Sequence, residues 1–315
     1  MIWFARRVAL SLLLVWMVAT MVFAAIHLVP GDPAEIMLSE GGFAPNPASV
    51  AALRKELGLD RPLLTQYRDW MVGLARGELG TSLLDSVPVT EVIARRLPRT
   101  LELILAATLF AALFGLPLGT LAAVYRGGKL DRALNTVAAI FDGMPVFVIA
   151  TLLIFVLARQ LRWVSTGGYV PLAVDPAEHL RLLAMPTVAI GLGLGAVVLR
   201  MTRAAVLDTM LRDYVRTARS KGASPLRILV HHALRNALMP VVTVLALHMG
   251  AMLGGTVLTE FVFNWPGVSS MMIDAVNSRD YPVVVGTLFV IATLFVALNL
   301  AVDLVYGVLD PRVRG

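Results

Sequence analysis

Six apolar stretches, each about as long as a bilayer is thick, set what this chain can fold into. A helix needs about 20 mostly apolar residues to cross the hydrocarbon core of a membrane. The stretches cover residues 8–26, 100–124, 133–158, 183–200, 237–260 and 283–309. Hydrophobic residues make up 58% of the chain, more than the usual share in a soluble domain. The sequence therefore predicts an all-α polytopic membrane protein with six transmembrane helices.

Basic residues gather on one side of this predicted topology. Six crossings place both termini on the same side as two connecting segments. The basic regions on that side are Arg6 and Arg7, segments 125–132 and 200–235, and Arg312 and Arg314. Because cytoplasmic loops are enriched in lysine and arginine, we expect this side to be cytoplasmic. The net charge of +6 reflects that bias, so we expect no nucleic-acid partner.

The spans divide the chain into regions. The expected regions are the N-terminus with the first span (1–26), a small external subdomain (27–99), a five-helix core (100–309) that contains the loop 201–236, and a cytoplasmic tail (310–315). The first apolar run is long for a signal peptide, so an uncleaved span is favoured over a cleaved signal.

The external subdomain carries helical periodicity. We expect helices at residues 48–57 and 62–77, the second with Pro62 in its first turn and Asp60 as its cap. Its apolar residues fall on one face at helical spacing. They are Leu63, Leu64, Tyr67, Trp70, Met71 and Leu74. This face either packs on the membrane part or lies on the bilayer surface.

A strongly basic segment, residues 213–241, follows the fourth span. We expect one helix over 207–221, a break at Gly222, and a second helix over 225–238. The second helix has an apolar stripe at helical spacing. The stripe consists of Leu226, Leu229, Val230, Ala233 and Leu234. A basic loop that only sets topology needs neither stripe nor hinge, so the pattern indicates a docking element for a soluble cytoplasmic partner.

This segment resembles the coupling loop of ABC-importer permeases. That loop reads Glu-Ala-Ala, three residues, Gly, nine residues, an apolar residue, one more, then Leu-Pro. Ala218, Gly222 and Leu234 match it, whereas the Glu, one Ala, the apolar residue and the Pro do not. The chain is more closely similar to the first permease subunit of the dipeptide, oligopeptide, glutathione and nickel importers. The matching motifs are LVPGDP, LGLDRPLLTQYRDWMVGLARGELGTS, DYVRTARSKG, HALRNALMP, EFVFNWPGVSSMM and NLAVDLVYGVLDPRVR.

The resemblance implies a division of labour in a prokaryotic inner membrane. This chain would pair with a homologous second permease, two ATPase subunits would dock on the coupling loops, and an extracytoplasmic solute-binding protein would deliver peptide. The expected ATPase contact comprises Ala218, Arg219, Lys221, Gly222, Ala223 and Ser224. A Walker loop needs Gly, four residues, and then Gly-Lys followed by Ser or Thr. The nearest Gly-Lys pair, Gly128-Lys129, has Ala123 in place of the first Gly and Leu130 in place of the Ser or Thr, so the chain has no Walker loop. We therefore expect no cofactor here, with ATP and magnesium on the ATPases.

Polar residues within the spans are candidates for the translocation path, because charges there are costly and face a cavity or a partner. The candidates are Asp142, His248, Glu260, Asn299 and Asp303. For each of them, a hydrogen bond between helices is the alternative explanation. No metal site is expected at His248, which has no second ligand at suitable spacing.

Other functions fit the sequence less well. Glutathione or a nickel chelate is the alternative cargo within the same family. A secondary transporter would need internal repeats and midplane ion sites, and no repeat is visible. An intramembrane enzyme would need a motif such as Gly-x-Ser-x-Gly, which does not occur; catalytic residues are not expected.

Overall fold

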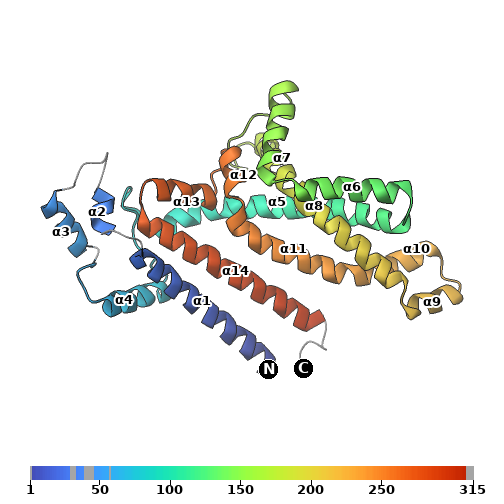
Figure 1. The fold of residues 1–315 in the computed structure, drawn as a ribbon, viewed down its shortest axis with the longest axis horizontal. Helices are drawn as coiled ribbons and strands as arrows, with labels where there is room; N and C mark the ends of the chain where they lie inside the picture. Colours follow the sequence, from blue (N-terminus) through green and yellow to red (C-terminus); the bar gives the residue numbers. More distant parts are fainter. Residues whose placement is uncertain (1, 29–32, 39–45, 57, 310–315) are drawn as a thin grey trace. The chain divides into compact units, whose positions relative to one another are not determined.

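The computed structural model describes residues 2–28, 33–38, 46–56 and 58–309, and this part of the chain is helical (Figure 1). Within these ranges the only extended pairing is one bridge between Thr81 and Pro88. Five helices are long and apolar enough to cross a membrane, and a bent pair of helices makes a sixth if it counts as one span. The predicted all-α fold with six spans is confirmed.

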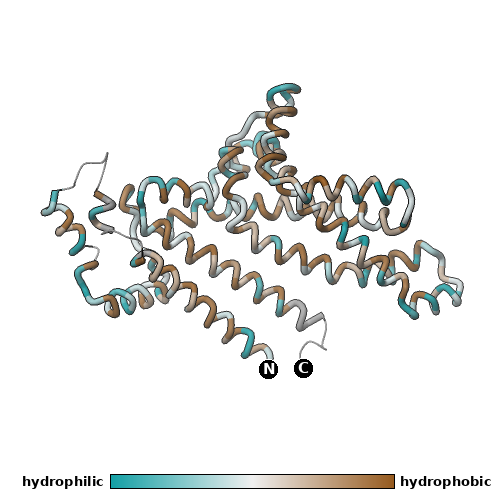
Figure 2. Tube along the Cα trace, in the orientation of Figure 1, coloured by the Kyte–Doolittle hydropathy of each residue, from teal (hydrophilic) through white to brown (hydrophobic). Residues whose placement is uncertain are grey.

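The helical elements alternate between long spans and short connecting helices. In chain order they are α1 (Ile2–Leu28), α2 (Pro33–Leu38), α3 (Pro47–Glu56), α4 (Leu63–Ala75), α5 (Val89–Val124), α6 (Lys129–Gly143), α7 (Val146–Leu153), the π-helix η1 (Ile154–Gln160), α8 (Pro176–Met210), α9 (Asp213–Ser220), α10 (Pro225–Arg227), the π-helix η2 (Ile228–Leu234), α11 (Arg235–Gly255), α12 (Val257–Val262), α13 (Val268–Asn277) and α14 (Tyr281–Leu309). Figure 2 shows hydrophobic residues along α14 and hydrophilic residues around the α9–α10 turn.

The chain forms two compact units. One comprises Met1–Pro98 and Val268–Gly315, and the other comprises Arg99–Gly267. In the first unit, α1 packs along α14, and α13 packs on the start of α14. Its core joins residues from both parts of the sequence. The buried members are Leu79, Val89, Ile93, Val268, Met271, Ala275 and Val283.

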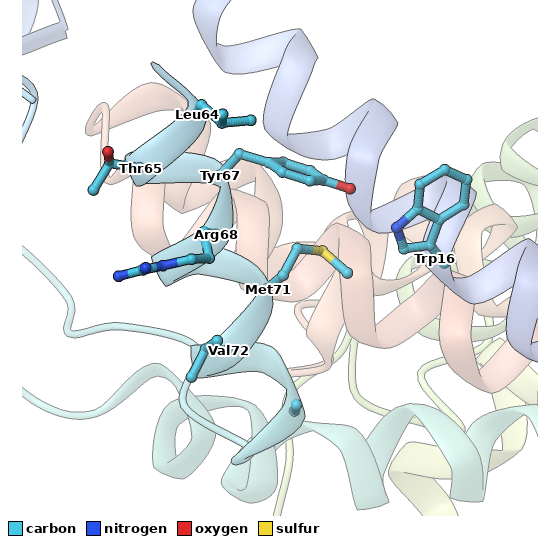
Figure 3. A pocket seen from close by; sticks show the side chains of 8 residues that line it. Trp16, Leu64, Thr65, Tyr67, Arg68, Met71 and Val72 are labelled. Atoms are coloured by element: carbon cyan, nitrogen blue, oxygen red, sulfur yellow. The ribbon is translucent and has the colours of Figure 1, made fainter. Parts of the chain in front are cut away.

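Helix α4 leans against α1 in the first unit (Figure 3). The Tyr67 hydroxyl lies 2.8 Å from the Thr20 hydroxyl, and Tyr67 and Met71 point toward α1. The outer end of the predicted apolar face stays open, since Leu64 is 79% exposed. A groove of about 610 Å³ remains between the two helices. Asp60 does not cap α4, because Pro62 holds the N-cap position without a side-chain hydrogen bond; that prediction was wrong.

In the second unit, α8 is the central helix, and α6, α7 and α11 all pack against it. Helix α5 approaches α8 so closely that only glycine fits. A Cβ atom on Gly115 would lie 2.7 Å from Val198, and one on Gly119 would lie 2.4 Å from the Leu199 carbonyl oxygen. Small residues therefore let these two spans pack with their backbones close together, as is common in membranes.

The third predicted span, residues 133–158, is not one straight helix. Helix α6 ends at Gly143, and α7 with η1 leaves it at an angle of 102°. Met144 adopts an extended conformation before Pro145, which has no amide hydrogen to continue the helix. The fifth predicted span, 237–260, is also interrupted, because α11 ends at Gly255 and α12 starts at Val257.

Candidate functional site

The segment between α8 and α11 contains the predicted coupling residues. The expected helix over 207–221 is split, because α8 runs on to Met210 and a new helix, α9, starts at Asp213. The break falls at Leu211 and Arg212, where Arg212 is extended with φ −70° and ψ 147°. The coupling element is therefore a short helix set apart from the span, rather than a continuation of it.

Helix α9 ends in a Schellman turn built from the predicted residues. The Ala223 amide donates to the Ala218 carbonyl at 3.1 Å, and the Gly222 amide donates to the Arg219 carbonyl at 3.0 Å. Gly222 has φ +83°, in the left-handed region that glycine adopts without strain. Gly222 is thus required by the backbone, and the predicted break at this position is confirmed.

The next helix begins immediately after this turn. The Ser224 hydroxyl accepts a hydrogen bond from the Arg227 amide at 3.4 Å, and Pro225 occupies the first helical position. Serine at the cap followed by proline is a favourable helix start. Residues 218–224 therefore form a defined turn between two helices, with Arg219, Lys221, Gly222 and Ser224 exposed.

The predicted apolar stripe of the second helix is only partly correct. Leu226 and Val230 are 70% and 46% exposed, whereas Ile228 and Ala233 are buried. The reason is the π-helix η2, in which hydrogen bonds join residues five apart and shift the face that turns inward. Ile228 and Ala233 are separated by five residues. The prediction assumed α-helical spacing throughout.

The coupling segment is seated on the ends of the spans. Val215 of α9 is buried, and the Asn236 amide nitrogen of α11 lies 3.0 Å from the Tyr214 hydroxyl of α9. A small core, to which η2 contributes Ala233, joins the ends of α5, α8 and α11. Its buried members are Ala123, Val206, Ala233 and Ala237. Helix α9 packs on η2, which is part of this core.

The charge on this surface is mainly positive. A guanidinium nitrogen of Arg212 donates to the Asp208 carboxylate at 2.6 Å, and this carboxylate raises the pKa of Arg212. Within the described ranges, Arg219, Lys221 and Arg227 have no carboxylate at ion-pair distance. These cations remain available to an acidic partner surface.

The predicted path residues differ in their contacts. Asp142 pairs with Arg200, and Asp303 pairs with Arg7. Asn299 donates to the Phe295 carbonyl of its own helix at 2.9 Å. His248 is half-buried on α11. Asp142 and His248 belong to the second unit, and Asn299 and Asp303 belong to the first.

Glu260 is enclosed by its own unit. It is fully buried, and its carboxylate accepts from the Thr100 hydroxyl at 2.7 Å. A Cβ atom on Gly267 would lie 2.3 Å from this carboxylate, so glycine is needed there. These surroundings favour a structural role over the predicted place in the path.

Sequence reasoning missed several polar groups of the second unit. His179 is buried, with Nδ1 2.7 Å from the Val170 carbonyl and Nε2 2.8 Å from Glu102. Asp131 holds Arg203 through two hydrogen bonds at 2.6 and 2.8 Å. The one available signal for the Asp131–Arg203 pair is that Arg203 follows Arg200 by three residues near the end of a span. In the searched part of the chain, no three potential metal ligands cluster.

Two family models match the chain. Residues 115–315 match the binding-protein-dependent transport system inner membrane component, and residues 1–104 match the N-terminal model for such membrane components. A probable peptide ABC transporter permease protein of Sinorhizobium fredii is 39% identical over 313 residues, 99% of each chain. A di/tripeptide transport system permease protein of Pseudomonas aeruginosa is 41% identical over 330 residues, 98% of each chain.

The fold also matches a solved structure. An inward-facing form of the MetNI methionine ABC transporter aligns with a TM-score of 0.55 at 18% identity, covering 69% of this chain and 96% of that one. At this identity the likeness concerns the fold alone. The family matches and the full-length relatives carry the assignment: this chain belongs to the inner-membrane components of binding-protein-dependent transport systems, a family of multi-pass ABC permeases.

Proposed function

We propose that this chain is a permease subunit of an ATP-driven peptide importer, in which it forms half of the translocation path beside a homologous second permease. The full-length relatives named as peptide permeases support the cargo class. The spans of α1, α5, α8, α11 and α14, with the bent pair of α6 and α7–η1 as the sixth, provide the membrane part of that half.

Two ATPase subunits dock on the permeases, and for this chain the contact is the α9–α10 turn. The observation that carries this proposal is the turn itself. It is exposed, positively charged and fixed by hydrogen bonds, and α9 and α10 pack on η2, which shares a core with the ends of three spans. ATP and magnesium bind on the ATPases, because the chain has no Walker loop of its own.

The coupling then follows from the seating of α9. When the ATPases close on ATP, they move α9. The bond between Tyr214 and Asn236 passes that movement to α11, and the packing of α9 on η2 passes it to α8, which η2 also contacts. The spans switch between inward and outward access, a two-state change of the kind that ligands bias. An extracytoplasmic binding protein delivers the peptide on the opposite side, and both termini lie in the cytoplasm.

The first test is the composition of the transporter. The complex is purified gently through a tag on this chain and analysed by mass spectrometry. A second six-span permease and ATPase subunits are expected, together with a binding protein whose bound ligand is a peptide. This chain alone or as a homodimer, with proton-driven uptake, would instead support a secondary transporter. Bound glutathione or a nickel chelate would replace peptide as the cargo.

A further inference from the structure

An ion pair joins α6 to α8 within the membrane-spanning part of the second unit. A guanidinium nitrogen of Arg200 donates to the Asp142 carboxylate. The two side chains are 42% and 36% exposed, so neither is enclosed by its own chain. Charged groups in membrane-spanning segments face water or a protein partner rather than lipid. The pair therefore opens onto an aqueous cavity or the second permease.

A second ion pair between α6 and α8, formed by Asp131 and Arg203, differs from the first in its hydrogen bonds and in its exposure. Asp131 and Arg203 form two hydrogen bonds, and Asp131 also accepts from the Gly127 amide at 2.9 Å and the Asn135 amide at 2.7 Å. Its side chain is 5% exposed. Because its carboxylate oxygens are saturated and covered, this pair acts as a structural clamp.

Asp142 is held far less completely. Among the described residues, its carboxylate has one hydrogen-bond donor, Arg200. It lies directly before Gly143, where the chain bends by 102° into α7. A half-exposed ion pair contributes little to stability, so little free energy is needed to separate Asp142 from Arg200. The carboxylate and the guanidinium are each available for exchange with a charged ligand.

We propose that Asp142 and Arg200 bind the two charged ends of a short peptide as it crosses the membrane. This inference rests on the proposed function and names the residues that meet the cargo. Asp142 receives the peptide ammonium, and Arg200 receives the carboxylate through its planar fork of donors. The charged ends of a dipeptide lie about 7 Å apart, so the contacting Asp142 and Arg200 side chains must separate to receive them. Each protein charge exchanges one partner for another, so no charge is left unpaired.

The test compares uptake of three probes by the complete transporter in proteoliposomes: alanyl-alanine, N-acetyl-alanyl-alanine and alanyl-alanine amide. Each variant is measured with the same binding protein, so differences in capture cancel when the uptake ratios of variant and wild type are compared. Asp142→Asn should lower the preference for alanyl-alanine over the acetylated probe by about tenfold, the size of one lost hydrogen bond to a charge. Arg200→Gln should do the same against the amide.

The clamp provides the matched control. Asp131→Asn and Arg203→Gln should lower uptake of all probes together and leave the ratios unchanged. Unchanged ratios in Asp142→Asn and Arg200→Gln would overturn the inference. The swapped pair, Asp142→Arg with Arg200→Asp, separates the explanations further: a clamp would be restored, whereas a peptide site would not. If the wild-type transporter does not take up alanyl-alanine, that result would instead count against the proposed function.

A second measurement covers variants that fail to assemble and probes that are not taken up. The chain has no cysteine, so Ala139→Cys, one turn from Asp142, introduces a single thiol. This thiol should react with a polar thiol reagent, and millimolar alanyl-alanine should slow the reaction. Adding Asp142→Asn should abolish that protection. A thiol that does not react, or protection that survives Asp142→Asn, contradicts the proposed site.

Discussion

Two short helices of this chain end in the same type of turn but differ in how they pack against the rest of their units. Helices α4 and α9 both end in a Schellman turn, with Gly77 at φ +79° and Gly222 at φ +83°. Each is held to a long helix through a tyrosine hydroxyl, Tyr67 to Thr20 of α1 and Tyr214 to Asn236 of α11.

The differences lie outside this local geometry. Helix α4 has no buried residue and borders an open groove, whereas Val215 of α9 is buried. The α9 turn leads directly into a second helix, while residues 77–88 form a non-helical connection. The same backbone motif therefore ends a helix with no buried residue in one unit and a helix with a buried residue, Val215, in the other. Burial and connection to the spans, rather than the turn itself, support the coupling role that we propose for α9.

The largest expected effect comes from proline at the two glycines. Gly222→Pro forces φ to about −65° and removes the amide that bonds Arg219, so the turn cannot form. ATP-driven uptake should fall by about tenfold or more. Gly77→Pro disrupts the equivalent turn of α4 and should leave most uptake intact. Uptake and membrane levels are measured together; similar uptake losses in both variants would remove the distinction.

Charge reversal at the matching helix ends should have the next largest effect. Lys221 and Arg76 occupy the same C-cap position in α9 and α4. Lys221→Glu places a negative charge on the proposed ATPase contact, so the ATPases should dissociate about tenfold more readily, with a reduced dependence on salt. Arg76→Glu should not change ATPase retention. Sedimentation of the complex at two salt concentrations gives the answer, and equal retention would argue against docking at α9.

Removing the tyrosine hydroxyls should produce a smaller effect. Tyr214→Phe deletes the bond from α9 to Asn236, a loss of about 1 kcal/mol. Less movement should then reach α11, so fewer peptides should enter per ATP hydrolysed. Tyr67→Phe deletes the corresponding bond of α4 and should not alter that ratio. A fall in the ratio for Tyr67→Phe alone would reverse the roles given to the two helices.

The smallest effect concerns the helix starts. Ser224→Ala removes the cap of α10 and should lower the stability of that turn by about 1 kcal/mol. Asp60→Ala should leave α4 unchanged, since Asp60 makes no cap there. Amide hydrogen exchange at each turn compares the two. Faster exchange around residue 62 in Asp60→Ala would restore the cap that the sequence predicted.

The sequence predicts best what depends on local chemistry. The length of the apolar runs predicts the spans, because a bilayer fixes that length. Gly222 followed by Ser224 and Pro225 predicts the helix break, since each residue type has its own backbone preference. The sequence predicts a helix over residues 48–57, and α3 spans Pro47–Glu56.

What the sequence does not predict depends on distant contacts. Pro145 marks an interruption, but neither the 102° bend there nor the packing of α7 on α8 can be read from the local sequence. The predicted stripe of residues 225–238 is only partly correct, because a periodic sequence pattern does not reveal a π-helix. The pairs Asp131–Arg203 and Asp142–Arg200 join residues 72 and 58 positions apart, a pairing that no local spacing specifies. The sides of the membrane, the expected regions and the roles of the coupling residues stay predictions.

The most direct test of the coupling role compares Gly222→Val with Gly77→Val. A Cβ atom at either position meets nothing within 4 Å, and the left-handed backbone makes both changes unfavourable by about 1 to 2 kcal/mol. The local penalty is therefore the same, and only the position differs. Peptide uptake and ATP hydrolysis are measured together in proteoliposomes containing the complete transporter. The account predicts continued hydrolysis without uptake in Gly222→Val and coupled uptake in Gly77→Val; coupled uptake in both would contradict it.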